Sequence, residues 1–325
     1  PREGFVATSN QQIIDGDDPY LAYEWATAGR ANRVIESLEG KAKLSPQTIA
    51  DLQGDTTSVR ARGWARYLAS RPTMTGNAER ARALLASWDG NLFPESSEAL
   101  LHGCFIRSLN QLLIEPIVGA DTWAWITTPG NTGPEGLVRQ WAYNVGAQLD
   151  RPELNTTPAS VDGRPLASVL SRVLPYALAA AWREAALLGE SNEPEDWRWD
   201  AVHVVAGQHT LTPSFPELAA KLDPPNVPFG GDSDTVQAAA TNIAPPAGNA
   251  PPFKVGGLTV YRQVVDFTDP EHATWIIPGG ASGLPGTPHA NDQLEHWRTH
   301  QRIPMHLTPT DTHSAARRTL TLQPA

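Results

Sequence analysis

The sequence predicts an α+β fold, with a large helical block followed by a C-terminal β-hairpin. Between residues 20 and 190, apolar residues return every three or four positions, which is the period of amphipathic helices. Two segments near the C-terminal end, 258–267 and 274–277, are instead rich in β-branched residues and alternate. An apolar run at residues 4–9 has the composition of a short strand. We expect this single strand to pair with the later strands in one layered structure.

Glycine, proline and serine mark the ends of the individual helices in the block at 20–190. A helical pattern runs from Tyr20 to Glu39 and is closed by Gly40. Ser45 and Pro46 are the N-cap and first-turn residues of the next helix. Further helical periods are expected at 59–69, 77–88, 96–117, 136–148 and 165–188.

The character of the chain changes after about residue 190. Residues 191–255 are expected to be rich in loops, with one strand between 197 and 210 and a long ordered loop at 222–252. The short link at 268–272 favours a hairpin, so residues 256–305 are expected to form a hairpin and a loop that returns to the core sheet. With residues 1–10 as a core strand, the predicted sheet is incomplete, which suggests that more chain belongs to this fold.

The composition excludes several classes of partner. Asp and Glu number 35 against 25 Lys and Arg, so the formal net charge is −10, and there is no basic stripe for nucleic acid or an anionic membrane. No apolar run approaches the roughly 20 residues that span a bilayer. The one cysteine, Cys104, lies in an apolar helical pattern and is expected to be a buried small hydrophobe.

Three local patterns resemble catalytic or metal-binding motifs but do not match them. The glycines around Ser282 lack the G-x-S-x-G spacing of a nucleophile elbow. His296 and His300 have helical i, i+4 spacing, but Glu295 precedes them and no third zinc ligand is evident. Asp232 and Asp234 lack the later glutamate of an EF-hand.

Several stretches in a fixed order resemble the penicillin acylase family, also called the penicillin amidases. The clearest is the strand pattern Val260-Tyr-Arg-Gln-Val-Val-Asp-Phe267, followed by Pro278-Gly-Gly-Ala-Ser-Gly283, Thr287-Pro-His289 and Asp292-Gln293. Earlier in the chain, an apolar run into Asn10 and the stretch Ala31-Asn-Arg-Val-Ile-Glu36 match as well. Each motif is weak by itself, but their ordered combination is specific and extends from about residue 3 to 305.

The resemblance implies an αββα N-terminal-nucleophile hydrolase sandwich, in which autocatalytic cleavage exposes a serine that attacks an amide carbonyl. Residues 1–325 are then expected to be the C-terminal part of the β-chain, because Pro1 cannot serve as the nucleophile. The implied partners are the α-chain and the serine-bearing N-terminal part of the β-chain, together with a small-molecule amide substrate. Family precursors are typically exported, so a periplasmic or secreted location is expected. An alternative is that the isolated chain is an inactive structural or interaction fragment.

The resemblance also assigns two residues to the catalytic site. Asn10 matches the asparagine that donates to the oxyanion, although an asparagine that ends a strand at a turn is common. Arg33 matches an arginine that lies near Asn10 and the nucleophile's amino group. Arg30, one turn earlier on the same helix face, is the rival for that match.

No cofactor is required by this mechanism, but some members of the family bind a structural Ca2+ near the segment that corresponds to residues 15–18. The carboxylates of Asp15, Asp17 and Asp18 suit a hard cation, and Asp17 and Asp18 are the candidate ligands here. A solvated acidic loop is the competing interpretation. The other residues in family motifs, namely His203, His289, Asp232 and Asp234, are expected to fix loops through hydrogen bonds.

Overall fold

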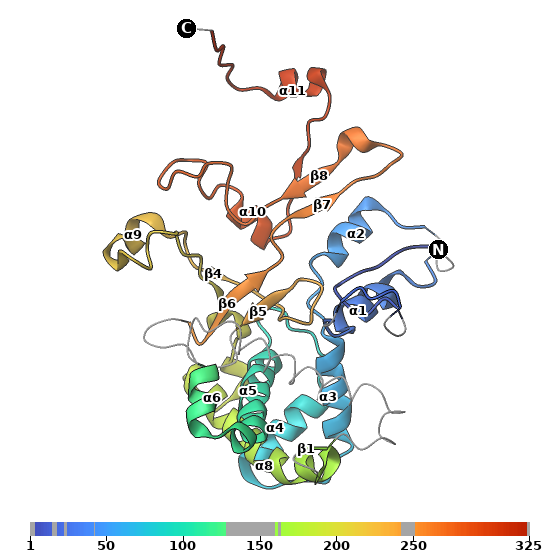
Figure 1. The fold of residues 1–325 in the computed structure, drawn as a ribbon, viewed down its shortest axis with the longest axis vertical. Coiled ribbons are helices and arrows are strands. Elements are labelled where there is room, and N and C mark those ends of the chain that lie inside the picture. Colours follow the sequence, from blue (N-terminus) through green and yellow to red (C-terminus); the bar gives the residue numbers. More distant parts are fainter. Residues whose placement is uncertain are drawn as a thin grey trace. The chain divides into compact units, whose positions relative to one another are not determined.

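The structure is a computed structural model that describes residues 4–14, 18–22, 25–41, 43–127, 160–161, 164–241 and 251–323. The chain divides into two compact units (Figure 1). The first unit comprises residues 1–40, 55–207 and 225–258, and the second comprises residues 41–54, 208–224 and 259–325. Among the described residues, no helix combines the length and the apolar character that crossing a membrane requires.

The first unit contains most of the helices. They are α1 (Gly29–Leu38), α3 (Val59–Ala69), α4 (Gly76–Ala86), α5 (Ser97–Val118), α6 (Ala120–Ile126) and α8 (Leu166–Leu188). Hydroxyl side chains cap two of them, because Ser58 Oγ accepts from the Ala61 N–H and Ser96 Oγ accepts from the Ala99 N–H. These caps satisfy backbone donors that would otherwise have no partner inside the helix.

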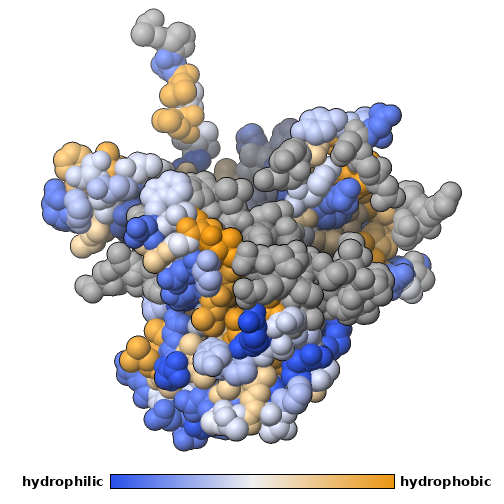
Figure 2. Space-filling model, turned by 60° about the horizontal axis from the view of Figure 1, so that its bottom comes forward, coloured by the Kyte–Doolittle hydropathy of each residue, from blue (hydrophilic) through white to orange (hydrophobic). Residues whose placement is uncertain are grey.

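The core of the first unit lies where α5 packs against α8, with α3 and α4 beside them. Trp64 and Phe105 meet edge to face with ring centroids 5.2 Å apart, and Cys104 is fully buried among apolar side chains, as expected. Figure 2 shows mainly hydrophilic and neutral residues over the outer surface of these helices, with a strip of hydrophobic residues beside them. The helices are therefore amphipathic and turn their apolar faces inward.

Two sheets accompany the helices of the first unit. Strands β1 (Ser160–Val161) and β2 (Arg164–Pro165) form one antiparallel pair. The other sheet has the order β4-β3-β6-β5, with bounds β3 (His203–Val205), β4 (Val227–Pro228), β5 (Ala239–Thr241) and β6 (Phe253–Leu258). Strands β3 and β6 run parallel with His203 opposite Phe253, whereas the outer pairs are antiparallel.

His203 lies in the middle of this sheet and is fully buried. Its two ring nitrogens face the carbonyl oxygens of Phe229 and Ala239 at 2.5 and 3.1 Å, and its ring stacks on Trp199 with centroids 4.3 Å apart. Burial lowers the pKa of His203 to about 4, so the ring is neutral near pH 7. A neutral imidazole carries a single N–H, so His203 donates a hydrogen bond to one of these two carbonyl oxygens at a time. This bond ties β3 to a neighbouring segment, as expected of a residue that fixes loops.

The second unit is smaller and is built around a three-stranded antiparallel sheet. Its strands are β7 (Arg262–Val264), β8 (Thr274–Ile276) and β9 (Ile303–Pro304), in that order. Its helices are α2 (Pro46–Leu52), α9 (Ala219–Leu222), α10 (Leu294–Arg298) and α11 (Pro309–Ala315). The N-cap predicted at Ser45 is confirmed, because Ser45 Oγ accepts from the Thr48 N–H at 3.1 Å. The predicted hairpin is also confirmed, as the pair β7 and β8.

The N-terminal segment differs from the prediction. Residues 4–9 form no strand, and the core strand predicted for residues 1–10 is reduced in the described part to a single bridge between Gln11 and Ala26. The Ala26 N–H donates to the Asn10 carbonyl at 2.9 Å. The chain around Ala26 therefore bonds to residue 10 and is not part of a helix. For that reason α1 begins at Gly29 and not at Tyr20.

The C-terminal strands differ in detail as well. The single strand predicted at 258–267 is divided between β6 and β7, because β6 pairs with β3 and β5 whereas β7 pairs with β8. The loop predicted at 222–252 contains β4 and β5. The helix predicted at 136–148 lies outside the described residues.

Candidate functional site

Asn10 lies at a sharp turn and is held by its own backbone. Its φ of 68° is in the left-handed region, which asparagine tolerates better than most residues. Its carbonyl accepts from the Ala26 N–H at 2.9 Å, and the preceding Ser9 N–H donates to Gln11 Oε1 at 2.6 Å. The backbone on both sides of the Asn10 side chain is therefore anchored.

The Asn10 side chain is held by Arg30, from the first turn of α1. Arg30 Nη2 donates to Asn10 Oδ1 and to the Ser9 carbonyl oxygen, each at 2.8 Å. A guanidinium group can only donate, so it selects the amide orientation in which Oδ1 faces it. The Nδ2 group then points away from Arg30, and no described residue accepts from it. Because Asn10 is exposed, its two Nδ2 hydrogens are available to a ligand.

Arg33 is directed to other partners. Its Nε lies 3.1 Å from both carboxylate oxygens of Asp55, its Nη2 lies 2.5 Å from Asp55 Oδ2, and its Nη1 donates to Glu36 at 3.1 Å. These hydrogen bonds raise the pKa of Arg33, mainly through Asp55. The structure therefore brings Arg30, and not Arg33, into contact with the Asn10 side chain.

Glu36 extends the ion pairs along the exposed side of α1. Arg62 Nη2 lies 2.6 Å from Glu36 Oε2, and Arg33 pairs with the same oxygen. The hydrogen bond from Arg62, followed by that from Arg33, lowers the pKa of Glu36 to about 2. Because these charges are half exposed, solvent screens them and their stabilising effect is small.

A second ionic cluster lies at the start of α1 and is buried. Asp234 Oδ2 lies 2.9 Å from Arg60 Nε, and Asp234 Oδ1 accepts from Thr27 Oγ1 at 2.8 Å. Asp232 Oδ2 is 3.8 Å from Arg60 Nη2. Burial and the neighbouring Asp234 charge raise the pKa of Asp232 to about 6, although Arg60 opposes this shift. These acids contact protein groups, as expected of residues that fix loops.

Of the two candidate metal ligands, only Asp18 lies in the described part of the chain. Asp17 lies outside the described residues, and Asp18 is exposed. No group of three or more histidine, cysteine, aspartate or glutamate side chains among the described residues could hold a metal ion. Ca2+ requires about six to eight oxygen ligands, so Asp18 by itself does not fit this ion.

The histidines of the second unit have protein partners. His289 Nδ1 lies 2.7 Å from Asp292 Oδ2, and His296 Nδ1 contacts Gln301 Oε1 at 2.6 Å. His300 is partly buried against Arg262, whose Nη1 lies 3.1 Å from His300 Nδ1. Burial, followed by the charge of Arg262, lowers the pKa of His300 to about 4. Of the two i, i+4 histidines, His300 is thus packed within the second unit, whereas His296 is exposed and hydrogen-bonded to Gln301.

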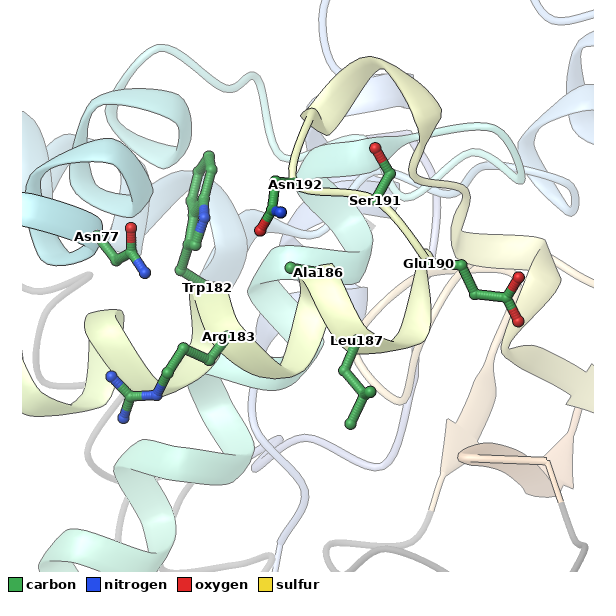
Figure 3. Close-up of a pocket in the computed structure, with 8 residues that line it drawn as sticks. All are labelled: Asn77, Trp182, Arg183, Ala186, Leu187, Glu190, Ser191 and Asn192. Carbon is green, nitrogen blue, oxygen red and sulfur yellow. The ribbon is translucent and has the colours of Figure 1, made fainter.

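A surface pocket of about 350 Å³ lies at the C-terminal end of α8 (Figure 3). Its lining residues are Asn77, Trp182, Arg183, Ala186, Leu187, Glu190, Ser191 and Asn192. The ring of Trp182 is already covered, because the Arg80 guanidinium lies 4.2 Å from its centroid and Trp197 packs edge-on at 4.8 Å. The pocket includes neither Asn10 nor Arg30, so we do not place the reaction there.

Comparison with known proteins identifies the group of enzymes to which these features belong. The profile of the penicillin amidase family matches residues 1–314. The chain is 29% identical to penicillin acylase 2 proenzyme of Pseudomonas sp. (strain SE83), over 94% of this chain and 37% of that protein. It is 25% identical to an acyl-homoserine lactone acylase of Pseudomonas aeruginosa, over 100% of this chain and 40% of that protein.

A solved structure shares the fold. A thermostable penicillin G acylase from Alcaligenes faecalis superposes with a TM-score of 0.55 at 16% identity, over 100% of this chain and 58% of that chain. The chain thus spans about two fifths of the length of the two sequence relatives. Since the family profile covers nearly all of it, the chain belongs to the penicillin amidase family and has its α+β, N-terminal-nucleophile hydrolase type of fold.

Proposed function

We propose that this chain is the C-terminal part of an N-terminal-serine amidohydrolase that cleaves an acyl amide, with Asn10 as a donor to the oxyanion. The observation that carries the proposal is the Asn10 amide itself, whose oxygen is held by Arg30 while its nitrogen donates to no other residue that the structure describes. The family and the named activities of its relatives support the reaction class. The serine nucleophile belongs to a part of the protein outside this chain.

In this reaction the serine oxygen attacks the carbonyl carbon of the amide. Its proton passes to the serine α-amino group and then to the leaving amine, and the carbonyl oxygen carries negative charge in between. Asn10 Nδ2 donates a hydrogen bond to that oxygen. Water then hydrolyses the acyl ester and releases the acid. A neutral amide suits the oxyanion because it stabilises charge without exchanging a proton.

Arg30 contributes in two ways. Its hydrogen bond keeps the Asn10 amide in one orientation, so that no reorganisation is needed when charge develops. Its positive charge also polarises the amide toward a stronger N–H donor. Arg30 is thus a positioning residue, because it acts on the oxyanion through Asn10.

The assembly follows from the same proposal. The chain acts in a heterodimer of an α-chain and a β-chain, and it forms the part of the β-chain that follows the serine-bearing segment. The two chains arise by autocatalytic processing in the periplasm or after secretion. The isolated chain is then a folded but inactive fragment. Turnover of an acyl amide by the isolated chain would contradict the assignment of the nucleophile to the rest of the protein.

The test uses this chain co-expressed with the rest of the protein, and the p-nitroanilides of phenylacetate and of octanoate as probes. Asn10→Asp keeps the shape and the acceptor for Arg30 but removes both Nδ2 donors. We expect kcat to fall by about 10²- to 10³-fold, the typical effect of losing one oxyanion donor. Asn10→Gly should fall similarly, and its backbone accepts a positive φ without strain.

The matched control is Asn32→Asp, the same chemical change at an exposed position of α1. It should leave kcat within twofold of the unmodified enzyme. Full activity of both Asn10→Asp and Asn10→Gly would overturn the role of Asn10.

A further inference from the structure

Asp234 contacts the part of the chain from which the Arg30 side chain emerges. Its carboxylate is 2% exposed and accepts from Thr27 Oγ1 at 2.8 Å. A Cβ atom built on Gly29 would lie 3.2 Å from Asp234 Cγ and 3.3 Å from each of its oxygens. The carboxylate is therefore packed directly against the residues that precede Arg30.

The start of α1 depends on this external carboxylate. The N-cap residue Ala28 provides no side-chain cap, and the first turn contains no acidic residue. A helix N-terminus carries partial positive charge, which a nearby carboxylate stabilises. Asp234 thus supplies from another segment the charge that helix α1 does not supply itself.

The carboxylate is in turn fixed to the core of the first unit. Arg60, in α3, is 7% exposed and places Nε 2.9 Å from Asp234 Oδ2. The Asp234 N–H also donates to Asp232 Oδ1 at 2.7 Å. The side chain and the backbone of Asp234 are therefore both held in place. Because the packing is close, Asp234 also limits where Thr27 and Gly29 can lie.

The loop that contains Asp234, residues 232–237, supports α1 at a second point. The Gln237 N–H donates to the Asp55 carbonyl oxygen at 2.9 Å, and the Asp55 carboxylate holds Arg33. The helix that presents Arg30 is thereby held at its first residue and, one turn later, at Arg33.

We infer that Asp234 is a positioning residue of the Asn10 site: by fixing Thr27 and Gly29 it sets where Arg30 holds the Asn10 amide. This inference rests on the proposed function. It extends the site to a buried residue more than 200 positions away in the sequence. Its experimental consequence is that a small displacement of the start of α1 changes catalysis without unfolding the protein.

Gly29→Ala is the sharpest variant, since it adds one methyl group directly against the Asp234 carboxylate. Alanine favours the helix more than glycine does, which offsets the cost of the close contact with Asp234, so the thermal midpoint of the assembled enzyme should change little. The new methyl group meets the Asp234 carboxylate at 3.2 Å, which is a tight contact, so Asp234 and the start of α1 have to move apart slightly. We expect kcat for the two p-nitroanilides to fall about tenfold, with KM within twofold, because misplacement of a site by about 1 Å can cost up to 10²-fold.

Two further variants keep the test independent of that single substitution. Thr27→Val keeps the shape of the side chain but removes its hydrogen bond to Asp234, and should also lower kcat more than KM. Gly283→Ala is the control, because a Cβ atom at Gly283 meets nothing within 4 Å. It should leave both kinetic constants unchanged.

A double-mutant cycle identifies the route of the effect. In an Asn10→Gly background, Gly29→Ala should cause no further loss of the residual kcat. An equal loss in both backgrounds, or unchanged kcat in Gly29→Ala and Thr27→Val, would overturn the positioning role. Full activity of Asn10→Gly alone would instead mean that the proposed function has failed.

Discussion

Arg30 and Arg33 lie three residues apart in α1, yet their guanidinium groups meet different kinds of partner. Arg30 donates to the neutral oxygens of Ser9 and Asn10, whereas Arg33 is paired with the carboxylates of Asp55 and Glu36. Neutral acceptors leave most of the electrostatic field of a nearby cation in place, whereas two carboxylates beside a cation largely cancel its field. The electrostatic effect on the Asn10 amide therefore comes mainly from Arg30.

Asp232 provides a test at the residue scale through its pKa, which rises from 3.8 to about 6 in the folded protein. Between pH 4 and pH 6 the folded state binds a proton that the unfolded state releases, so this group's contribution to stability declines as pH rises through that range. The amide introduced by Asp232→Asn cannot ionise. We expect this variant to be more stable than the unmodified protein at pH 8, by about 1–3 kcal/mol, at about 1.4 kcal/mol for each pKa unit.

Urea unfolding at pH 8 and at pH 4 measures this difference, which should largely vanish at the lower pH. A lower stability of Asp232→Asn at pH 8 would show that attraction to Arg60, 3.8 Å away, outweighs the cost of burying the charge.

At the scale of elements, the helices differ in how their first turns are satisfied. Helices α3 and α5 begin with a serine whose hydroxyl accepts a backbone N–H, but α1 has no side-chain cap of its own. Both capped helices contribute to the core, whereas α1 depends on contacts from Asp55 and Asp234. The helix that bears the proposed site is thus positioned by tertiary contacts more than by its local sequence.

Ser96→Ala tests the cap of the longest core-forming helix before α8. Ser96 is 1% exposed and its Oγ accepts from the Ala99 N–H at 3.0 Å. Losing the cap usually costs about 0.5–2 kcal/mol, and we expect the upper part of that range because the Ala99 N–H is buried and would have no partner. Thermal unfolding should show a lower midpoint. Ser97→Ala, which removes no cap, should show a smaller change.

At the scale of the whole molecule, the chain comprises a helical first unit with its own apolar core and a smaller second unit around a three-stranded sheet. Each unit contains a histidine whose pKa is lowered by burial, the fully buried His203 in the first and the partly buried His300 in the second. The helical core adds His102, which is 3% exposed beside Trp88. Acid sensitivity is therefore a property of both units.

His102 gives the clearest prediction about acid stability. Burial, followed by the charge of Arg60, lowers its pKa from 6.5 to about 3 in the folded state. The unfolded state therefore binds the proton first, and stability is lost as pH falls below 6.5, at up to about 1.4 kcal/mol for each pH unit. His102→Phe keeps a ring beside Trp88 but cannot titrate.

Urea unfolding between pH 4.5 and pH 7 should show a smaller loss of stability for His102→Phe than for the unmodified protein. Equal slopes would mean that His102 does not remain neutral in the folded core.

Local patterns in the sequence were enough to place the helices of the core and the terminal hairpin. Helix α3 has the bounds predicted for it, and the Ser45 cap is confirmed, because periodicity and capping depend on neighbours within about one turn. The ordered family motifs were enough to identify the family and to single out Asn10. Only the tertiary structure decided that residues 4–9 are not a strand and that one predicted strand is two. Strand pairing depends on partners distant in the sequence, which composition does not reveal.

The choice between Arg30 and Arg33 shows the same division. The sequence placed both on one face of a helix near Asn10, and nothing local distinguishes them. Only the fold sets the direction of α1, through Asp234 at its start and Asp55 beside Arg33. The proposed chemistry of the site therefore rests on residue types and family motifs. Contacts across the fold decided which guanidinium group meets the Asn10 amide, because the conformation of a long arginine side chain depends on the charged partners and the space around it.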